Sequence, residues 1–362
     1  MKILFRYILK EFLGNLCLGL IIFTFVMLLD HLFELIDLVL NKGVGFWMTL
    51  QLLFLLLPSS LSLTLPMSSL LAALLTFGRL SEDNEITAVK ASGLSAWNFV
   101  RAPLTAALAA VLFLIPFNTV WAPHAHSHFR QLYLQVLQRN PLVRIEEKTF
   151  FEIGDYHLYV EKKDRKTKEM KGIEIIQTPA DNAPLRIFAN HGEAAVDPVR
   201  GMTFNLHDGT IAQIDPAHPD QWFYTGFQTY VLSIPFQQQS QASSRSLEEM
   251  DNQELQAEIR QRRSQGLPYP LFAVQKQLRW ALAMTPLLFV MLGIPLAIRV
   301  HRGGRSIGFG ISLVVLVVYY VLVMGGAGAG QRGLWPAWLA VWLGNVVISV
   351  LAAALGWRFL HQ

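Results

Sequence analysis

Six long runs of predominantly apolar residues constrain this chain more than any other feature. They cover residues 12–40, 46–78, 99–122, 272–298, 306–326 and 334–360. Each run supplies the roughly 20 residues that an α-helix needs to cross about 30 Å of hydrocarbon. The sequence therefore predicts a membrane α-helical protein with six transmembrane helices, three before and three after a polar central region.

Composition excludes several classes of protein. Only 15% of the 362 residues are charged and 52% are hydrophobic, which argues against a soluble enzyme and against a disordered chain. Cys17 is the single cysteine, so no internal disulfide can form and a secreted disulfide scaffold is excluded. The net charge of +4 is explained by basic residues beside the membrane, so it does not indicate nucleic-acid binding.

Lysine and arginine in the short loops predict the orientation, because they accumulate on the cytoplasmic side. The basic segments are the amino-terminal tail and the loops after the second and fourth spans (Lys2, Arg6, Lys10; Arg79, Lys90, Arg101; Arg299, Arg302, Arg305). The opposite short loops are poorer, with Lys42 in one and Arg332 in the other. Both termini are therefore expected to be cytoplasmic and the central domain to lie outside.

The central region predicts an all-β domain. Short segments rich in aromatic and β-branched residues, separated by turn-forming clusters, begin at Phe150, Lys171, Leu185, Met202 and Trp222. Regular short strands of this kind are typical of a sandwich or jelly roll. A short connecting helix follows, with a capping box formed by Asp251 and Glu254. The predicted boundaries are 1–123 for the first three spans, 124–250 for the β domain, 251–270 for the connecting helix and 271–362 for the last three spans.

Motifs for nucleotide binding or catalysis are missing from the sequence. It contains no GxxxxGK[ST] loop, no HExxH, no GxSxG and no CxxC, and no Gly-Lys dipeptide at all. The GGAGAG stretch at residues 325–330 follows a membrane run rather than a strand, so we interpret it as a glycine-rich end of the fifth span. The sequence thus predicts no catalytic residues and no cofactor bound by this chain.

Three histidines alternate just after the third span, at His124, His126 and His128. On a strand these imidazoles would share one face and could bind zinc or copper. No carboxylate or thiolate lies nearby in the sequence, so we prefer a solvated exit from the membrane, without a metal.

The loop between the second and third spans, GRLSEDNEITAVKASGLSAWNF, predicts a short cytoplasmic helix over about residues 81–92. Ser81 and Asp83 are the expected caps, because acidic and hydroxyl side chains favour a helix amino terminus. Ile86 and Val89 would form its apolar side. Such a helix suits insertion into a groove on a cytoplasmic partner, and the alternative is an ordinary surface helix.

Three carboxylates share one face of the first span, because Asp30, Glu34 and Asp37 are spaced i, i+4 and i+7. Each ionisable residue costs about 2.5–3.5 kcal/mol at the centre of a span, so these should face a cavity, a partner helix or the outer interface. They either line a substrate path or mark the wet end of the helix. A carboxylate row would also support a proton- or ion-coupled secondary lipid carrier, which is the alternative function.

Several segments resemble the LptF/LptG (YjgP/YjgQ) permease family, the membrane subunits of the lipopolysaccharide exporter. They are RYILKEFLGN before the first span, LTLPMSSLLAALLTFGRLSEDNEITAVKASGLS across the second span and its loop, LGIPLAIRVHRGGRSIGFGISLVVLVVYYVL across the fourth and fifth spans, and WPAWLAVWLGN in the sixth. The order of three spans, a jelly roll and three spans is also the family's. The LptF branch fits slightly better than the LptG branch.

The resemblance implies a non-catalytic subunit of an ABC exporter in the bacterial inner membrane. In the family, two paralogous permeases, one LptF-like and one LptG-like, pair on a dimer of a cytoplasmic LptB-like ATPase, which binds the ATP and magnesium. Lipopolysaccharide leaves the membrane and passes through periplasmic jelly rolls to LptC-like and LptA-like proteins. The chain would therefore serve outer membrane biogenesis.

The resemblance also implies roles for individual residues. The short loop helix becomes the coupling helix, and Glu85 falls on the acidic position of the family's EIT/EIV motif, which pairs with an arginine of the ATPase. Asp83, Ile86 and Val89 accompany it in the segment that contacts the ATPase.

In the family, span 1 of one subunit and span 5 of the other form lateral gates for the lipid. The resemblance therefore assigns Asp30, Glu34 and Asp37 to a lateral gate or the substrate path. Some members carry basic residues here, whereas this acidic row would repel lipid phosphates. The basic candidates for lipid phosphate are Lys42, Lys276 and Arg279, with ordinary interfacial snorkelling as the alternative.

Overall fold

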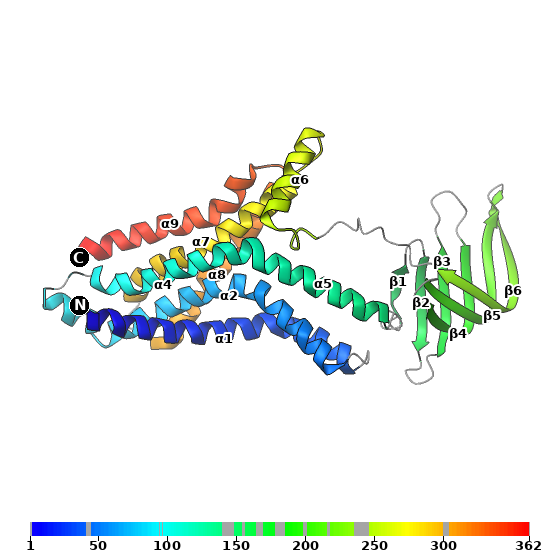
Figure 1. Ribbon diagram of the computed structural model, residues 1–362, viewed down its shortest axis with the longest axis horizontal. Coiled ribbons are helices and arrows are strands. Elements are labelled where there is room, and N and C mark those ends of the chain that lie inside the picture. Colours follow the sequence, from blue (N-terminus) through cyan, green and yellow to red (C-terminus); the bar gives the residue numbers. More distant parts are fainter. Residues whose placement is uncertain are drawn as a thin grey trace. The chain divides into compact units, whose positions relative to one another are not determined.

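The computed structural model describes residues 2–40, 45–93, 95, 97–139, 148–153, 156–163, 169–177, 185–197, 201–215, 218–234, 246–299 and 304–361. The chain forms two compact units. A helical unit comprises residues 1–130 and 245–362, and a β unit comprises residues 131–244. The helical unit is thus assembled from both ends of the sequence, with the β unit inserted between them (Figure 1).

The described helices follow the order α1 (Lys2–Leu40), α2 (Phe46–Glu82), α3 (Glu85–Ala91), α4 (Trp97–Pro116), a π-helical turn η1 (Phe117–Trp121), α5 (Ala122–Arg139), α6 (Asn252–Ser264), α7 (Pro270–Arg299), α8 (Gly304–Gln331) and α9 (Ala337–His361). In the part of the chain that the structure describes, six helical stretches are long and apolar enough to cross a membrane. The third of them runs without interruption from α4 through η1 into α5. The predicted fold class, six spans with an inserted β domain, is confirmed.

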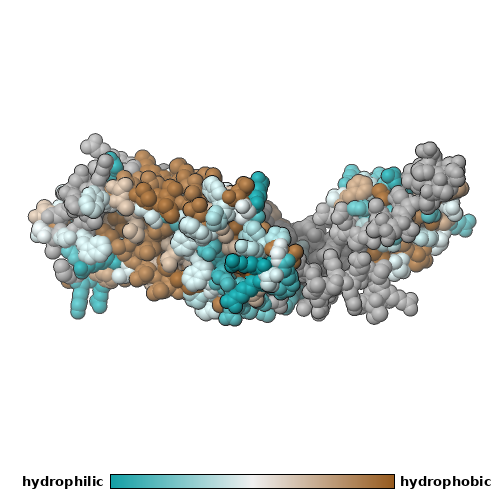
Figure 2. All heavy atoms as spheres, turned by 90° about the horizontal axis from the view of Figure 1, so that it is seen from above, coloured by the Kyte–Doolittle hydropathy of each residue, from teal (hydrophilic) through white to brown (hydrophobic). Residues whose placement is uncertain are grey.

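Helix α7 is the central helix of the helical unit. In its most apolar window 61% of the residues are buried, compared with 17% in α1 and 22% in α8. It packs against α2, α4 and α9, and α2 in turn packs against α1 and α8. The side chains that α1 and α8 leave exposed are large and apolar, as in Phe25, Val314 and Val321. Apolar surface accordingly gathers over the helical unit in Figure 2.

A buried hydrogen-bond network joins the last three long helices. The Tyr319 hydroxyl of α8 lies 2.6 Å from the Thr285 Oγ1 of α7 and donates to the Asn345 Oδ1 of α9 at 2.8 Å. The Asn345 amide donates to the carbonyl of Ala281 at 3.0 Å. Hydrogen bonds between membrane helices are worth about 0.6 kcal/mol each on average, so the network specifies the packing more than it stabilises it.

The glycine-rich stretch at 325–330 is the end of α8, as predicted, and it brings α8 against α9. A Cβ on Gly326 would lie 2.0 Å from the Ala340 carbonyl oxygen, and a Cβ on Gly330 would lie 2.9 Å from the Ala340 Cβ. Small residues allow such close approach of membrane helices. The GGAGAG pattern therefore serves helix packing.

The β unit is a six-stranded antiparallel sheet whose strands pair in sequence order. The strands are β1 (Phe150–Ile153), β2 (Tyr156–Lys163), β3 (Glu169–Gln177), β4 (Leu185–Asp197), β5 (Gly201–Asp215) and β6 (His218–Ile234). Each strand pairs with the next in sequence, so the described strands form a meander. This strand order is simpler than that of the sandwich or jelly roll that the strand spacing suggests.

One face of the sheet carries the apolar core of the β unit. Cross-strand registers align Leu158 with Ile175, Ile175 with Ile187, and Ala194 with Phe204. All of these side chains are buried, as is Leu206. Because alternate residues of a strand point to opposite faces, Phe204 and Leu206 lie on the interior face.

The segment that follows the third span is helical, which corrects the strand interpretation of its histidines. His124, His126 and His128 lie in α5. Residues two apart on a helix point in nearly opposite directions, whereas residues four apart share a face. His126 therefore points away from His124 and His128, and the three imidazoles do not converge on one face. No group of three His, Cys, Asp or Glu residues that could hold a metal occurs in the described part of the chain. The β unit begins at residue 131 rather than at 124.

Candidate functional site

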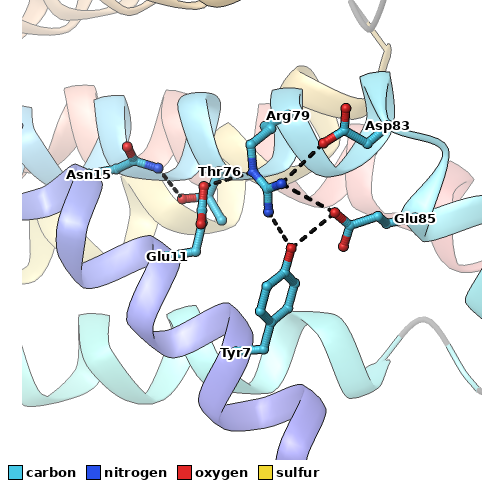
Figure 3. Close-up of polar contacts among 7 residues, drawn as sticks. All are labelled: Tyr7, Glu11, Asn15, Thr76, Arg79, Asp83 and Glu85. Carbon is cyan, nitrogen blue, oxygen red and sulfur yellow. Dashed lines mark hydrogen bonds and ion pairs between the residues drawn. The ribbon is translucent and has the colours of Figure 1, made fainter.

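A polar cluster surrounds Arg79 where α1, the last turn of α2 and the start of α3 meet (Figure 3). The Arg79 Nε donates to Glu11 Oε1 at 2.8 Å. Its Nη1 donates to Asp83 Oδ2 at 3.1 Å and to Glu85 Oε1 at 3.2 Å. Its Nη2 donates to the Tyr7 hydroxyl at 2.6 Å. One guanidinium therefore links three helical segments.

Glu85 has a second internal partner. The Tyr7 hydroxyl donates to Glu85 Oε1 at 3.0 Å, and the Arg79 guanidinium carbon lies 5.7 Å from the centre of the Tyr7 ring. Tyr7 and Glu11 are four residues apart on α1, so both face the end of α2. The position and side-chain direction of Glu85 are therefore set by Arg79, six residues before it, and by Tyr7, which lies 78 residues before it in another helix.

The cluster carries excess negative charge. One guanidinium faces three carboxylates, those of Glu11, Asp83 and Glu85. The side chains of Asp83 and Glu85 are 50% and 33% exposed, whereas that of Arg79 is 23% exposed. An acidic surface with its own cation partly buried beneath it is suited to a basic side chain of another protein.

The short helix differs in length from its prediction. Ser81 and Glu82 complete α2, and Asp83 is the C-cap of α2 rather than an N-cap. Asn84 has a φ of 56°, a left-handed conformation that turns the chain before α3 begins at Glu85. The expected helix over about 81–92 is thus two elements joined by a tight turn.

The apolar residues of α3 pack inward, which corrects their assignment to a docking face. Ile86 is 5% exposed and belongs to the same core as Ile8 and Phe12 of α1. Val89 is half-buried against that core. The exposed side of α3 carries Thr87 and Ala88, small side chains next to the acidic cluster. Among the described side chains of α3, those that face outward are small or acidic rather than large and apolar.

The side chains of the predicted gate residues, and one predicted lipid-contact residue, lie outside what the structure describes. Asp30, Glu34 and Asp37 belong to α1, but their side chains are outside the described residues. Lys42 lies outside the described residues altogether. Their assigned roles stay predictions.

Lys276 and Arg279 do not form one basic patch. Arg279 is 7% exposed and its Nη2 donates to the carbonyls of Leu247 and Glu248 at 3.1 and 3.3 Å. Its role in this structure is to hold the turn before α6. Lys276 donates instead to Gln256 Oε1 and lines a separate surface pocket. Of the two, Lys276 is the less buried, and the assignment of both residues to lipid phosphate stays a prediction.

A second ion-pair cluster lies beside that turn. Arg130 of α5 pairs with Glu249 at 2.7 Å, and Glu249 also accepts from the Ser246 hydroxyl at 2.9 Å. His126 lies 3.4 Å from Glu248. The basic and the acidic residues of this ion-pair cluster are more than 100 positions apart in the sequence, so residue spacing does not reveal the cluster.

Tyr7, Glu11 and Arg79 were not singled out as site residues by the sequence. Arg79 contributed only to the orientation, as one of several loop cations. The available signals were the i, i+4 pairs Tyr7–Glu11 and Arg79–Asp83. One pair lies at the start of the first span and the other at the end of the second, and both positions are predicted to be cytoplasmic. Such pairs are common on helices, so they do not identify a site without the contact between α1 and α2.

These features define a multi-pass helical membrane protein with an inserted antiparallel β domain. The profile of the family described as lipopolysaccharide export system permease LptF/LptG matches residues 6–358, and the chain belongs to this family. It is 24% identical to the LptF permease protein of Escherichia coli K12 over 98% of this chain and 94% of that relative, and the LptF protein of Shigella flexneri matches equally. The LptG protein of E. coli K12 is 24% identical over 46% of this chain and 48% of its own length. The longer match to LptF agrees with the predicted branch.

Proposed function

We propose that this chain is the transmembrane permease subunit of an ABC exporter that extracts lipopolysaccharide from the inner membrane. A separate ATPase dimer supplies the energy, and the ATP and magnesium bind there. Both termini face the cytoplasm, and the β unit is periplasmic. The family supports the lipopolysaccharide transport role, and the acidic cluster around Glu85 is the observation that carries the coupling to an ATPase.

The coupling step rests on the geometry of this cluster. Glu85 stands at the start of α3 next to Asp83, in a surface where carboxylates outnumber the guanidinium of Arg79. An arginine of the ATPase would find an acceptor whose direction is already set by Tyr7 and Arg79. Docking there would transmit motion of the ATPase to α1 and α2, because both helices contribute to the cluster.

A paralogous LptG-like permease is the proposed partner within the membrane. Helices α1 and α8 are the least buried spans and expose apolar side chains along their length. The same two spans form the lateral gates in the family, so a second permease would cover part of these faces. The acidic row on α1 would then lie near the gate.

The β unit would pass the lipid to an LptC-like and then an LptA-like jelly-roll protein. Its interior face is apolar, which suits acyl chains. Among the described strands, β1 and β6 each pair on one side only, and such edges can accept a strand from another sheet. The long β6 offers the greater length for such pairing.

Two measurements test this function. The full chain should co-purify with an ATPase and a paralogous permease, and the assembled complex in liposomes should release lipopolysaccharide only when ATP is supplied. Release driven by a pH step without ATP would overturn the exporter in favour of the proton-coupled lipid carrier. Absence of any co-purifying ATPase would also contradict it.

A further inference from the structure

An open pocket of about 780 Å³ lies between α6, α7 and α9, away from the acidic cluster. Helix α6 contributes Gln253, Gln256 and Arg260, helix α7 contributes Lys276 and Trp280, and helix α9 contributes Trp342. Its volume lies within the roughly 300–1,000 Å³ that small-molecule sites occupy. The pocket therefore has room for a lipid headgroup.

The walls of this pocket are held in place by hydrogen bonds. The ammonium of Lys276 donates to Gln256 Oε1, which joins α7 to α6. The indole of Trp342 donates to Gln277 Oε1 at 3.1 Å, which joins α9 to α7. The spacing of Gln253, Gln256 and Arg260 puts all three on one face of α6. Three separate helices thus present fixed polar groups to one space.

The pocket is cationic, because Arg260 and Lys276 line it and none of the other described residues that line it carries a carboxylate. The nearby acidic residues of α6 are engaged elsewhere. Glu258 pairs with Arg262 at 2.7 Å, and Glu254 accepts from the backbone N–H of Asp251 at 2.9 Å in the capping box. A guanidinium, an ammonium and amide donors together match the acceptors of a phosphate group.

We infer that this pocket binds the phosphate of an anionic lipid, with Arg260 and Lys276 as the charged ligands. The two indoles suit the level between headgroup and acyl chains, where tryptophan concentrates in membrane proteins. In the proposed orientation, the ends of α7 and α9 that line the pocket lie at the outer leaflet. The inference rests on the proposed function only for this orientation. The phosphate can belong to a bilayer phospholipid or to lipopolysaccharide.

Native mass spectrometry of the detergent-solubilised full chain, in its co-expressed complex, tests this inference without ATP. Phosphatidylglycerol, phosphatidylcholine, lipid A and dephosphorylated lipid A are added separately and the bound fraction of each is measured. Arg260→Gln and Lys276→Gln should each weaken binding of the preferred phosphorylated lipid by about tenfold, as expected for loss of a charge-assisted hydrogen bond. Arg263→Gln is the matched control, because Arg263 is exposed on α6 but does not line the pocket.

The lipid series distinguishes the two sources. Preference for phosphatidylglycerol over phosphatidylcholine assigns the pocket to bilayer phospholipid, whereas preference for lipid A over its dephosphorylated form assigns it to lipopolysaccharide. Equal binding of anionic phosphatidylglycerol and zwitterionic phosphatidylcholine, together with equal binding of lipid A and its dephosphorylated form, would overturn the inference. Equal losses in Arg260→Gln and Arg263→Gln would also overturn it. Because no step requires an ATPase, failure of the proposed export function leaves this result interpretable.

Discussion

Arg79 and Glu85 form an ion pair within this chain, with 3.2 Å between Arg79 Nη1 and Glu85 Oε1. The carboxylate expected to meet an arginine of another protein therefore already has an arginine of its own. Among the described contacts, both Arg79 and Tyr7 use Oε1, which leaves Oε2 for an external donor. Docking of a partner can thus add to the internal contact instead of replacing it.

Glu85→Ala should leave the protein inserted in the membrane while weakening ATPase binding and abolishing lipid export. Truncating one member of a partly desolvated ion pair costs on the order of 2–5 kcal/mol. Co-purification of the ATPase with the variant, followed by ATP-dependent release from liposomes, measures both effects.

Tyr7→Phe is the matched control for this variant. It removes the hydroxyl that donates to Glu85 and accepts from Arg79, but it keeps the Glu85 carboxylate and its contact with Arg79. Its ATPase binding should fall by a few-fold at most, in line with the roughly 0.5–1.5 kcal/mol net value of one hydrogen bond. Unchanged co-purification and unchanged export in Glu85→Ala would contradict the coupling role.

Arg79→Gln should destabilise the junction of α1, α2 and α3 by about 1–3 kcal/mol, because it leaves carboxylates close together without their shared cation. The thermal unfolding temperature in detergent should fall, and ATPase binding should fall with it. Arg79→Lys should lie between the two, since an ammonium keeps the charge but cannot make the several directed contacts of a guanidinium. Equal stability of Arg79→Gln and the unchanged protein would be incompatible with the structure.

Gly326→Ala should force α8 and α9 apart, because the added Cβ would lie 2.0 Å from the Ala340 carbonyl oxygen. Overpacking of this kind costs about 1–3 kcal/mol, which thermal unfolding in detergent would detect. Gly325→Ala is the control on the same helix, since its Cβ would meet no atom within 4 Å. A similar loss of stability in both variants would refute the close contact.

Photo-crosslinking amino acids at Phe204 or Leu206 should capture lipopolysaccharide when ATP is supplied to the assembled exporter, because both positions lie on the interior face of the β unit. The same group at Asn205 points to the opposite face and should capture much less. Capture at Asn205 alone, or at none of these positions, would rule out passage along the apolar face.

Glu34→Gln should leave transport dependent on ATP, with a moderate change in lipid affinity or gate stability. Removing like-charge repulsion on a helix face is worth only a few tenths of a kcal/mol in water. Glu34→Lys should perturb more, because it reverses the charge beside Asp30 and Asp37. Release from liposomes, with and without ATP at equal pH on both sides, makes the comparison, and pH-driven release that Glu34→Gln abolishes would favour the carrier.

Local patterns in the sequence predicted the elements well. Runs of apolar residues predicted the six spans, and the Asp251–Glu254 spacing predicted a capping box that the structure contains. Each of these depends on interactions within a few residues, which periodicity records directly.

Contacts between distant segments could not be predicted in the same way. Ile86 looked like part of an exposed apolar face because the core that buries it is built from other helices, including Ile8 and Phe12 of α1. Arg279 looked like a partner of Lys276 until the carbonyls of the turn before α6 were seen to hold it. The surroundings of a side chain depend on what packs around its helix, and the spacing of residues within one helix carries no record of that.

The ion pair between Arg130 and Glu249 has a consequence for how this protein can be rebuilt. These residues stand where the chain departs for the β unit and where it comes back, and their side chains meet at 2.7 Å. The ion pair therefore joins the two ends of the segment that is inserted into the helical unit. We therefore expect that a related β domain, or a short linker, can replace the segment between Arg130 and Glu249 while the spans keep their packing.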